Sequence, residues 1–290
     1  MSLILNHVDY VYGAGTVFEQ QALKDINLKI KDSEFVGIIG HTGSGKSTLI
    51  QLFNGLLQPT SGGVYYNGAD INDAYDKRKL RTKVGLVFQY PEHQLFESTI
   101  FKDVCFGPLN QGLTEKEAGL RAFEALRACG VEESLYYQPP FDLSGGQKKR
   151  VAIAGILAMK PEMIVLDEPA AGLDPLGRKE MLDMISSLHE KRNMTVVLVS
   201  HSMEDVAEYA DRLVVMSQGS IALDGTVKEV FSQAELLEKI GLAVPQVTSL
   251  MQDLRRKGLP VALDVTTLEE AKNEILKCFG GQQAWEKTLR

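Results

Sequence analysis

The segment Gly40–Ser47, GHTGSGKS, has the spacing G-x-x-x-x-G-K-[ST] after a short apolar run. Glycines let several backbone N–H groups approach one anion, and a helix N-terminus adds the positive end of its dipole. Lys46 can then reach the outer phosphates of a nucleotide, and the Ser47 hydroxyl can coordinate Mg²⁺. The pattern predicts a nucleoside-triphosphate site formed by Gly40, His41, Thr42, Gly43, Ser44, Gly45, Lys46, Ser47 and Thr48.

Two carboxylates, Asp167 and Glu168, follow a second apolar run, MIVL. At the carboxyl end of a core strand, Asp167 is placed to hold Mg²⁺ through water. Glu168 is suited to orienting and polarising an attacking water. His201 follows a third apolar run and is expected on the same rim, where it can hydrogen-bond the γ-phosphate.

A second glycine-bearing turn, LSGGQ, spans Leu143–Gln147 and opens another helix, with Ser144 as its expected N-cap. Its free N–H groups are suited to phosphate. The upstream loop already serves one nucleotide. If this turn lies too far from that loop, it must serve a nucleotide held by another chain, through Ser144, Gly145, Gly146 and Gln147.

The elements that position these residues alternate between strands and helices. Residues 3–12 and 23–30 alternate apolar and polar residues and predict half-buried strands, whereas 34–40 is a continuous apolar run typical of a strand buried on both faces. Strand-like runs at 163–167, 195–200 and 212–219 surround a helix at 176–192. This order predicts an α/β fold with a mostly parallel sheet, preceded by an antiparallel β subdomain.

The middle of the chain, about residues 68–138, is richer in helix signals and predicts an inserted helical subdomain. Within it, TEKEAGLRAFEALRACG has a Thr–x–x–Glu capping box and a terminal glycine. We expect a nucleotide-binding domain over residues 1–240, with the helical subdomain at about 90–160. A small helical tail over residues 241–290 is expected to serve dimerisation or an accessory role. The charge runs KRKLR and KKR are interpreted as solvated helix faces.

Composition narrows the class of protein. The 290 residues carry a net charge of −7, which argues against a nucleic-acid surface acting through bulk electrostatics. Three scattered cysteines (Cys105, Cys129 and Cys278) show neither metal-ligand spacing nor a disulfide framework and predict a reducing compartment. We expect no signal peptide and no membrane span, since VAIAGILAM is the longest apolar stretch.

Taken in order, these motifs resemble the ATP-binding-cassette (ABC) ATPases over about residues 3–235. The resemblance implies a P-loop NTPase fold that uses ATP and Mg²⁺, with two nucleotide domains sandwiching two ATP molecules head to tail. Tyr12 falls where the family stacks an aromatic ring on adenine, although Tyr10 and simple strand packing are open alternatives. The matching segments are the Walker A loop Gly40–Ser47, the Q-loop Gln89, the signature Leu143–Gln147, Walker B Ile164–Asp167, the catalytic Glu168, the D-loop Gly172–Asp174 and the switch residue His201. The resemblance implies that Gln89 and His201 act with Glu168 in catalysis, and that Gln89 joins Ser47 and Asp167 at the Mg²⁺.

Two segments, FQYPEHQLFE and AGLDPLGRKEM, resemble the ATPases of energy-coupling factor (ECF) transporters, and the match is nearest to their second ATPase subunit. This implies a motor subunit of an importer for vitamins or transition-metal ions, peripheral on the cytoplasmic face of the cell membrane. Its partners would be a second ATPase subunit (in a hetero- or homodimer), a transmembrane T component and a substrate-binding S component, with no nucleic acid. Another ABC transporter class and a soluble ABC ATPase are the alternatives. Tyr90, Leu95 and Phe96 are expected to form a docking patch or to pack against the helical subdomain.

Overall fold

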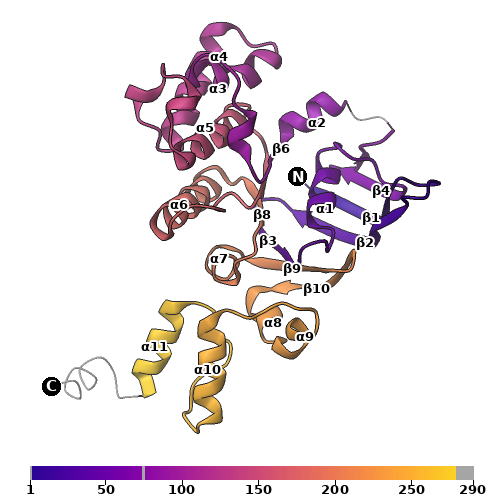
Figure 1. Cartoon of the computed structure of the whole chain (residues 1–290), viewed down its shortest axis with the longest axis vertical. Helices are drawn as coiled ribbons and strands as arrows, with labels where there is room; N and C mark the ends of the chain where they lie inside the picture. The colour runs from indigo at the N-terminus through magenta and orange to yellow at the C-terminus, as the bar shows by residue number, and fades with distance from the viewer. Residues whose placement is uncertain (1, 74–75, 279–290) are drawn as a thin grey trace, which may run out of the picture.

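The computed structural model describes residues 2–73 and 76–278, which form two β-sheets surrounded by helices (Figure 1). The strands are β1 (Ser2–Tyr12), β2 (Gln20–Lys31), β3 (Phe35–Gly40), β4 (Ser61–Tyr66), β5 (Ala69–Asp70), β6 (Val84–Val87), β7 (Met163–Asp167), β8 (Thr195–Val199), β9 (Arg212–Ser217) and β10 (Ser220–Thr226).

Eleven α-helices and three short 3₁₀ helices complete the described part of the chain. The α-helices are α1 (Lys46–Phe53), α2 (Lys77–Lys83), α3 (Ile100–Asn110), α4 (Glu115–Ala128), α5 (Gly145–Ala158), α6 (Pro175–Arg192), α7 (Met203–Tyr209), α8 (Val227–Phe231), α9 (Ala234–Lys239), α10 (Gln246–Arg256) and α11 (Leu268–Cys278). The 3₁₀ helices are η1 (Pro91–Gln94), η2 (Glu133–Leu135) and η3 (Pro140–Asp142).

The larger sheet has the strand order β10-β9-β3-β8-β7-β6. Its five strands from β9 to β6 are parallel, and β10 adds an antiparallel edge. Every residue of β3, β6, β7 and β8 is buried, as a sheet covered on both faces requires. The predicted mostly parallel α/β sheet is confirmed.

The smaller sheet has the order β2-β1-β4-β5, and its paired strands are antiparallel. It confirms the antiparallel β subdomain. Its inner residues, such as Leu5 and Ile26, pack with α1 and with one face of the larger sheet, including Ile38 and Val165. The phosphate loop between β3 and α1 is therefore held at the junction of two packed layers.

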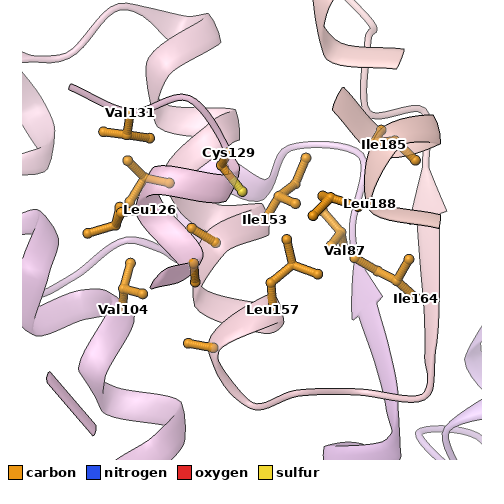
Figure 2. Packing of buried hydrophobic residues seen from close by; sticks show 14 of the residues in the cluster. Val87, Val104, Leu126, Cys129, Val131, Ile153, Leu157, Ile164, Ile185 and Leu188 are labelled. Atoms are coloured by element: carbon orange, nitrogen blue, oxygen red, sulfur yellow. The ribbon is translucent and has the colours of Figure 1, made fainter. Parts of the chain in front are cut away.

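The opposite face of the larger sheet is covered by α6 and by the helical lobe formed by α3, α4 and α5. Ile164 and Val87 from the sheet share one apolar cluster with Ile185 and Leu188 of α6 and with Ile153 of α5 (Figure 2). Because side chains alternate along a strand, Ile164 faces this cluster while its neighbour Val165 faces the other. The sheet thus fixes the helix after LSGGQ relative to the strand that ends in Asp167.

Local signals explain where several helices begin and end. In α4 the capping box is complete: the Thr114 hydroxyl accepts from Glu117 N, and the Glu117 carboxylate accepts from Thr114 N. Helix α1 ends at Phe53, and Gly55 just beyond it adopts a positive φ of 67° that stops the helix. The segment predicted to be mainly helical also contains the core strand β6 and the short strand β5, which its helix signals did not reveal.

The helices after β10 belong to two separate apolar clusters. Helices α8 and α9 share an apolar cluster with α7 and β9, whereas α10 and α11 form a separate small cluster around Met251 and Val261. These last two helices lie at the end of the molecule opposite the helical lobe (Figure 1). The predicted boundary at residue 240 stays a prediction, and residues 279–290 of the predicted tail lie outside the described residues. Within the described ranges, no helix combines the length and apolarity needed to cross a membrane.

Candidate nucleotide-binding and catalytic site

A pocket of about 700 Å³ opens above the carboxyl ends of β3, β7 and β8, a volume typical of small-molecule sites. It brings together residues that were predicted from distant parts of the sequence: Tyr12, Thr42, Gly43, Gly45, Lys46, Ser47, Thr48, Gln89, Glu168 and His201. Gly40, His41 and Ser44 of the predicted loop do not line it; Ser44 is fully buried beneath the loop.

Glycine is required at two points of this loop. Gly43 and Gly45 have φ values of 79° and 102°, which L-residues with a side chain rarely adopt. A Cβ at Gly45 would also come within 2.7 Å of the Ala22 carbonyl oxygen. The loop therefore approaches β2 closely and enters α1 with its N–H groups directed along the helix axis.

Lys46 is a buried cation at the base of the loop. Its Nζ donates to the Gly40 carbonyl at 2.7 Å and to the His41 carbonyl at 3.0 Å. Burial lowers the pKa of the ammonium, while the charges of Glu168 and Asp167 oppose that shift. The ammonium is thus held beside the loop, where an anionic ligand would favour its charged form.

Ser47 and Asp167 meet at the end of β7. The Ser47 hydroxyl donates to Asp167 Oδ2 at 3.2 Å, and only 7% of Asp167 is exposed. Burial raises the pKa of the Asp167 carboxyl, and the adjacent charge of Glu168 raises it further. A buried carboxylate next to a second one provides the hard oxygen donors and the negative charge that suit Mg²⁺.

Glu168 is contacted by the two other residues predicted to be catalytic. Its Oε1 pairs with His201 Nε2, and its Oε2 accepts from Gln89 Nε2 at 3.2 Å. The backbone of Glu168 has a φ of 52°, a left-handed conformation that costs a non-glycine residue about 1–3 kcal/mol. This backbone conformation directs the Glu168 carboxylate from the end of β7 toward the pocket.

The two tyrosines of β1 have different surroundings. Tyr12 is 40% exposed, lines the pocket and shares a hydrogen bond of 3.1 Å with Thr48 Oγ1. Tyr10 packs against the core cluster under the smaller sheet, with its ring edge-on to Tyr12 at 4.8 Å between centroids. Of the two, Tyr12 is the ring that a base in this pocket would meet.

The LSGGQ turn does not take part in this pocket. Ser144 caps α5 as predicted: its hydroxyl accepts from Gln147 N, while Gln147 Oε1 accepts from Ser144 N at 2.9 Å. The next two N–H groups, of Gly145 and Gly146, have no hydrogen-bond partner among the described residues, as first-turn groups of a helix often do not. None of the four residues lines the nucleotide pocket.

Several residues near these motifs were not found from the sequence. The pocket is also lined by residues of β2 and of the turn between β9 and β10, at positions that carry no motif spacing: Gln20, Gln21, Ala22, Lys24, Gln218 and Gly219. The interpretation of KKR as a solvated face is wrong for Lys149, which is 4% exposed and donates to the Ala171 carbonyl at 2.6 Å. The run KRKLR is exposed apart from Leu80 and the half-buried Lys77.

A second hollow, of about 720 Å³, lies between α2, η1, α3 and α5. Leu95 is partly buried against the helical core, as the packing alternative expected, whereas Phe96 is 61% exposed and lines the hollow. Tyr90 is also exposed but does not line it. The predicted patch is therefore divided: Leu95 and Phe96 both line the hollow, Leu95 partly buried and Phe96 exposed, whereas Tyr90 is exposed outside it.

Comparison with known proteins identifies the family. A profile of the ABC transporter family matches residues 23–171, just over half of the chain. The energy-coupling factor transporter ATP-binding protein EcfA2 of Caldanaerobacter subterraneus subsp. tengcongensis is 56% identical over 282 residues, which cover 97% of this chain and 99% of the relative. The protein of the same name from Acetivibrio thermocellus is 53% identical over 277 residues, covering 96% and 98%.

Solved structures agree with the sequence relatives. The structure of cbiO1 from Clostridium perfringens, described as part of the ABC transporter complex cbiONQ, has a TM-score of 0.73 at 41% identity and covers 86% of this chain and 98% of its own. A dimeric ATP-binding cassette in a post-hydrolysis state, bound to ADP and Pi, has a TM-score of 0.70 at 33% identity, with coverage of 78% and 98%. This chain belongs to the ABC transporter ATPases and, within them, to the family of energy-coupling factor transporter ATP-binding proteins.

Proposed function

We propose that this chain is the ATP-hydrolysing motor subunit of an ECF-type importer for vitamins or transition-metal ions. ATP binding would close a head-to-tail dimer of ATPase subunits and so drive a transmembrane component. The observation that carries the catalytic part is the meeting of Glu168, His201 and Gln89 above the phosphate loop. In that arrangement Glu168 polarises the attacking water, His201 contacts the γ-phosphate, and Gln89 reaches the water or the metal.

Mg²⁺ fits the residues at the end of β7. Ser47 and Asp167, which are hydrogen-bonded to each other, would supply oxygen ligands, and Ser47 and Gln89 line the pocket. Among the described residues no group of three or more His, Cys, Asp or Glu side chains could hold a metal by itself. This suits Mg²⁺, which proteins bind through one or two side chains together with substrate phosphates. When bound, Mg²⁺ would supply charge neutralisation at the phosphates.

The signature turn supports a dimeric arrangement. Gly145 and Gly146 offer N–H groups at the N-terminus of α5, yet they lie outside this chain's own pocket. A nucleotide held on the phosphate loop of a partner ATPase, either different or identical, would use them. The solved cassette with ADP and Pi is itself dimeric. The helical tail from residue 241 would add a dimerisation or accessory contact.

The hollow beside Phe96 is the surface we assign to the T component, which in turn joins the S component. Gly155 lies inside α5 and lines this hollow, and a Cβ added there would meet nothing within 4 Å. A helix-interior glycine with free space around it is explained by close approach of another backbone. Docking there would place the chain on the cytoplasmic face of the cell membrane as a peripheral subunit.

The function is tested with Glu168→Gln, which keeps the size and the hydrogen bond to Gln89 but removes the negative charge. In the transporter complex purified through a tag on this chain, kcat for ATP should fall by about 100-fold or more, because the water loses its polarising base. ATP should still bind, and the ATP-bound dimer should accumulate. Turnover near that of the wild type would remove Glu168 from the catalytic role and contradict the proposal.

A further inference from the structure

An ion pair links the two helices that begin just after the D-loop and just after His201. Arg178, in the first turn of α6, donates from Nε to Asp205 Oδ1 and Oδ2 at 3.0 Å each, and from Nη2 to Oδ2 at 2.7 Å. Asp205, in the first turn of α7, has a side chain that is only 13% exposed. A bidentate contact between a guanidinium and a largely buried carboxylate fixes both the distance and the relative orientation of the two helices.

Asp205 contacts both neighbours of His201, Ser200 through its carboxylate and Ser202 through its backbone N–H. Ser200 Oγ donates to Asp205 Oδ2 at 3.5 Å and accepts from Ser202 N at 3.1 Å. Ser202 Oγ caps α7 by accepting from Asp205 N at 3.2 Å. His201 is therefore carried on a turn whose two flanking residues are tied to Asp205.

Arg178 and Asp205 do not line the nucleotide pocket. They line a separate cavity of about 200 Å³, on whose wall Glu168 and His201 also lie. The ion pair thus stands behind the reacting groups, close to them but away from the nucleotide. Its hydrogen bonds reach the backbone that carries His201, through Ser200 and Ser202.

We propose that Arg178 and Asp205 are positioning residues for ATP hydrolysis, whose ion pair sets the place of His201 relative to Glu168. The inference rests on the proposed function of Glu168 and His201. His201 has a half-exposed side chain and is oriented by its contact with Glu168 and by its backbone. If the turn shifts, the histidine moves relative to the γ-phosphate while the phosphate loop keeps its shape.

The test compares Asp205→Asn and Arg178→Lys with the wild type in the purified transporter complex. Asp205→Asn keeps the shape of the side chain but removes its charge. Arg178→Lys keeps the charge but removes the planar guanidinium that makes the bidentate contact. In both we expect kcat to fall about 10- to 100-fold, the effect of misplacing a reacting group by about 1 Å. KM and the Kd for Mg²⁺-ATP should stay within about threefold, because these residues contact no part of the pocket. Asp205→Glu, which restores a carboxylate, should recover part of the lost kcat.

Tyr209→Phe is the matched control. The Tyr209 hydroxyl donates to Asp183 Oδ1 at 2.7 Å and so links the same two helices, but at the far end of α7 from His201. It should keep kcat within about twofold even if it lowers the melting temperature. A fall in kcat equal to that of Asp205→Asn would assign the pair a merely structural role and overturn the inference.

Glu168→Gln in the same assay distinguishes failure of the positioning role from failure of the proposed function. If it abolishes turnover while Asp205→Asn and Arg178→Lys leave kcat unchanged, the positioning role fails and the proposed function stands. If Glu168→Gln itself keeps turnover, the proposed function fails, and this inference fails with it. Should Asp205→Asn not fold, Arg178→Lys decides the outcome.

Discussion

Asp167 combines a buried position that is unfavourable for its charge with the proposed role of holding Mg²⁺. Its carboxylate is buried beside Glu168, and both conditions raise its pKa. Above the ordinary pKa of 3.8 the folded chain therefore keeps a proton that the unfolded chain has lost. The free energy of unfolding consequently decreases as the pH rises from about 3.8 through the raised pKa. At neutral pH an ionised Asp167 destabilises the protein without its cation.

We therefore expect Asp167→Asn to stabilise the nucleotide-free protein at neutral pH and to weaken the pH dependence just described. Thermal unfolding with and without Mg²⁺-ATP measures both effects. Because the cation loses its carboxylate ligand, the rise in melting temperature on adding Mg²⁺-ATP should be much smaller than in the wild type. The exposed carboxylate of Asp253 gives the control Asp253→Asn, which should change neither quantity. A less stable variant with an unchanged Mg²⁺-ATP shift would contradict this account.

At the residue scale, the sequence could predict groups that stand at the ends of apolar runs. Lys46, Asp167 and His201 each follow such a run, and parallel strands bring their carboxyl ends to one rim. Arg178 and Asp205 had no comparable signal, because they lie in first turns of helices whose mutual position depends on packing. Lys149 was mistaken for a solvated residue for the same reason: charge alone does not reveal a carbonyl partner on a distant loop.

At the element scale, two glycines lie where the larger sheet meets the helical lobe, and they differ in the space around them. Gly85 lies in β6, where a Cβ would overlap Ile156 Cγ2 of α5, whereas Gly155 lies inside α5 with open space around it. We expect Gly85→Ala to lower the free energy of unfolding by about 1–3 kcal/mol through overpacking. Gly155→Ala should raise it by about 0.5–1 kcal/mol, because alanine favours a helix interior.

Urea unfolding of the two variants at one pH measures both changes in the free energy of unfolding, and each variant serves as the control for the other. Equal effects of the same sign would show that α5 does not pack on β6 as described. An unstable Gly155→Ala variant would mean that α5 carries a constraint beyond its own propensity.

Helices and strands could be predicted from the sequence where a segment was long enough to repeat its apolar periodicity several times. The helix Pro175–Arg192 and the capping box of Thr114 were found because several turns repeat one signal. The strand Val84–Val87 was not found, since four apolar residues inside a helix-rich segment carry no period. It is recognised only from its place beside β7, with which it pairs. Short core strands thus depend on tertiary pairing that a local pattern does not contain.

At the scale of the whole molecule, the separation of LSGGQ from the nucleotide pocket makes a testable statement about assembly. Gly146→Asp adds a negative charge where a partner's γ-phosphate would approach. In mixed dimers in which only this chain carries the change, vanadate trapping of labelled 8-azido-ATP should lose the signal at the partner's phosphate loop. The control Gly146→Ala adds only a Cβ, 3.4 Å from Leu173 Cδ2, and should keep trapping. Loss of signal at this chain's own Lys46 site instead would exclude a head-to-tail sandwich.

The hollow proposed for docking lies close in sequence to the nucleotide site. Phe96 is presented on a fixed backbone, because the Asp103 carboxylate accepts from Phe96 N and Glu97 N at 2.8 Å each. Its ring meets Phe106 edge-on at 4.9 Å between centroids, and both rings line the hollow. Only a few residues separate this surface from Gln89, which bonds Glu168. If the proposed docking holds, a change in nucleotide occupancy at Gln89 would reach the partner through this short segment.

We expect Phe96→Asp to leave ATP binding by the isolated chain intact but to weaken assembly with the T component and stop transport. A carboxylate left unpaired in a groove contact costs a few kcal/mol, about 2–4, which suffices to break a peripheral association. Leu120→Asp is the matched control: Leu120 is also 61% exposed and lies in the same helical lobe, but it does not line the hollow. The amount of membrane subunit that co-purifies with the tagged chain measures assembly. Equal retention by both variants would refute the docking surface, whereas Leu95→Asp, at a half-buried site, is expected to unfold part of the lobe as well.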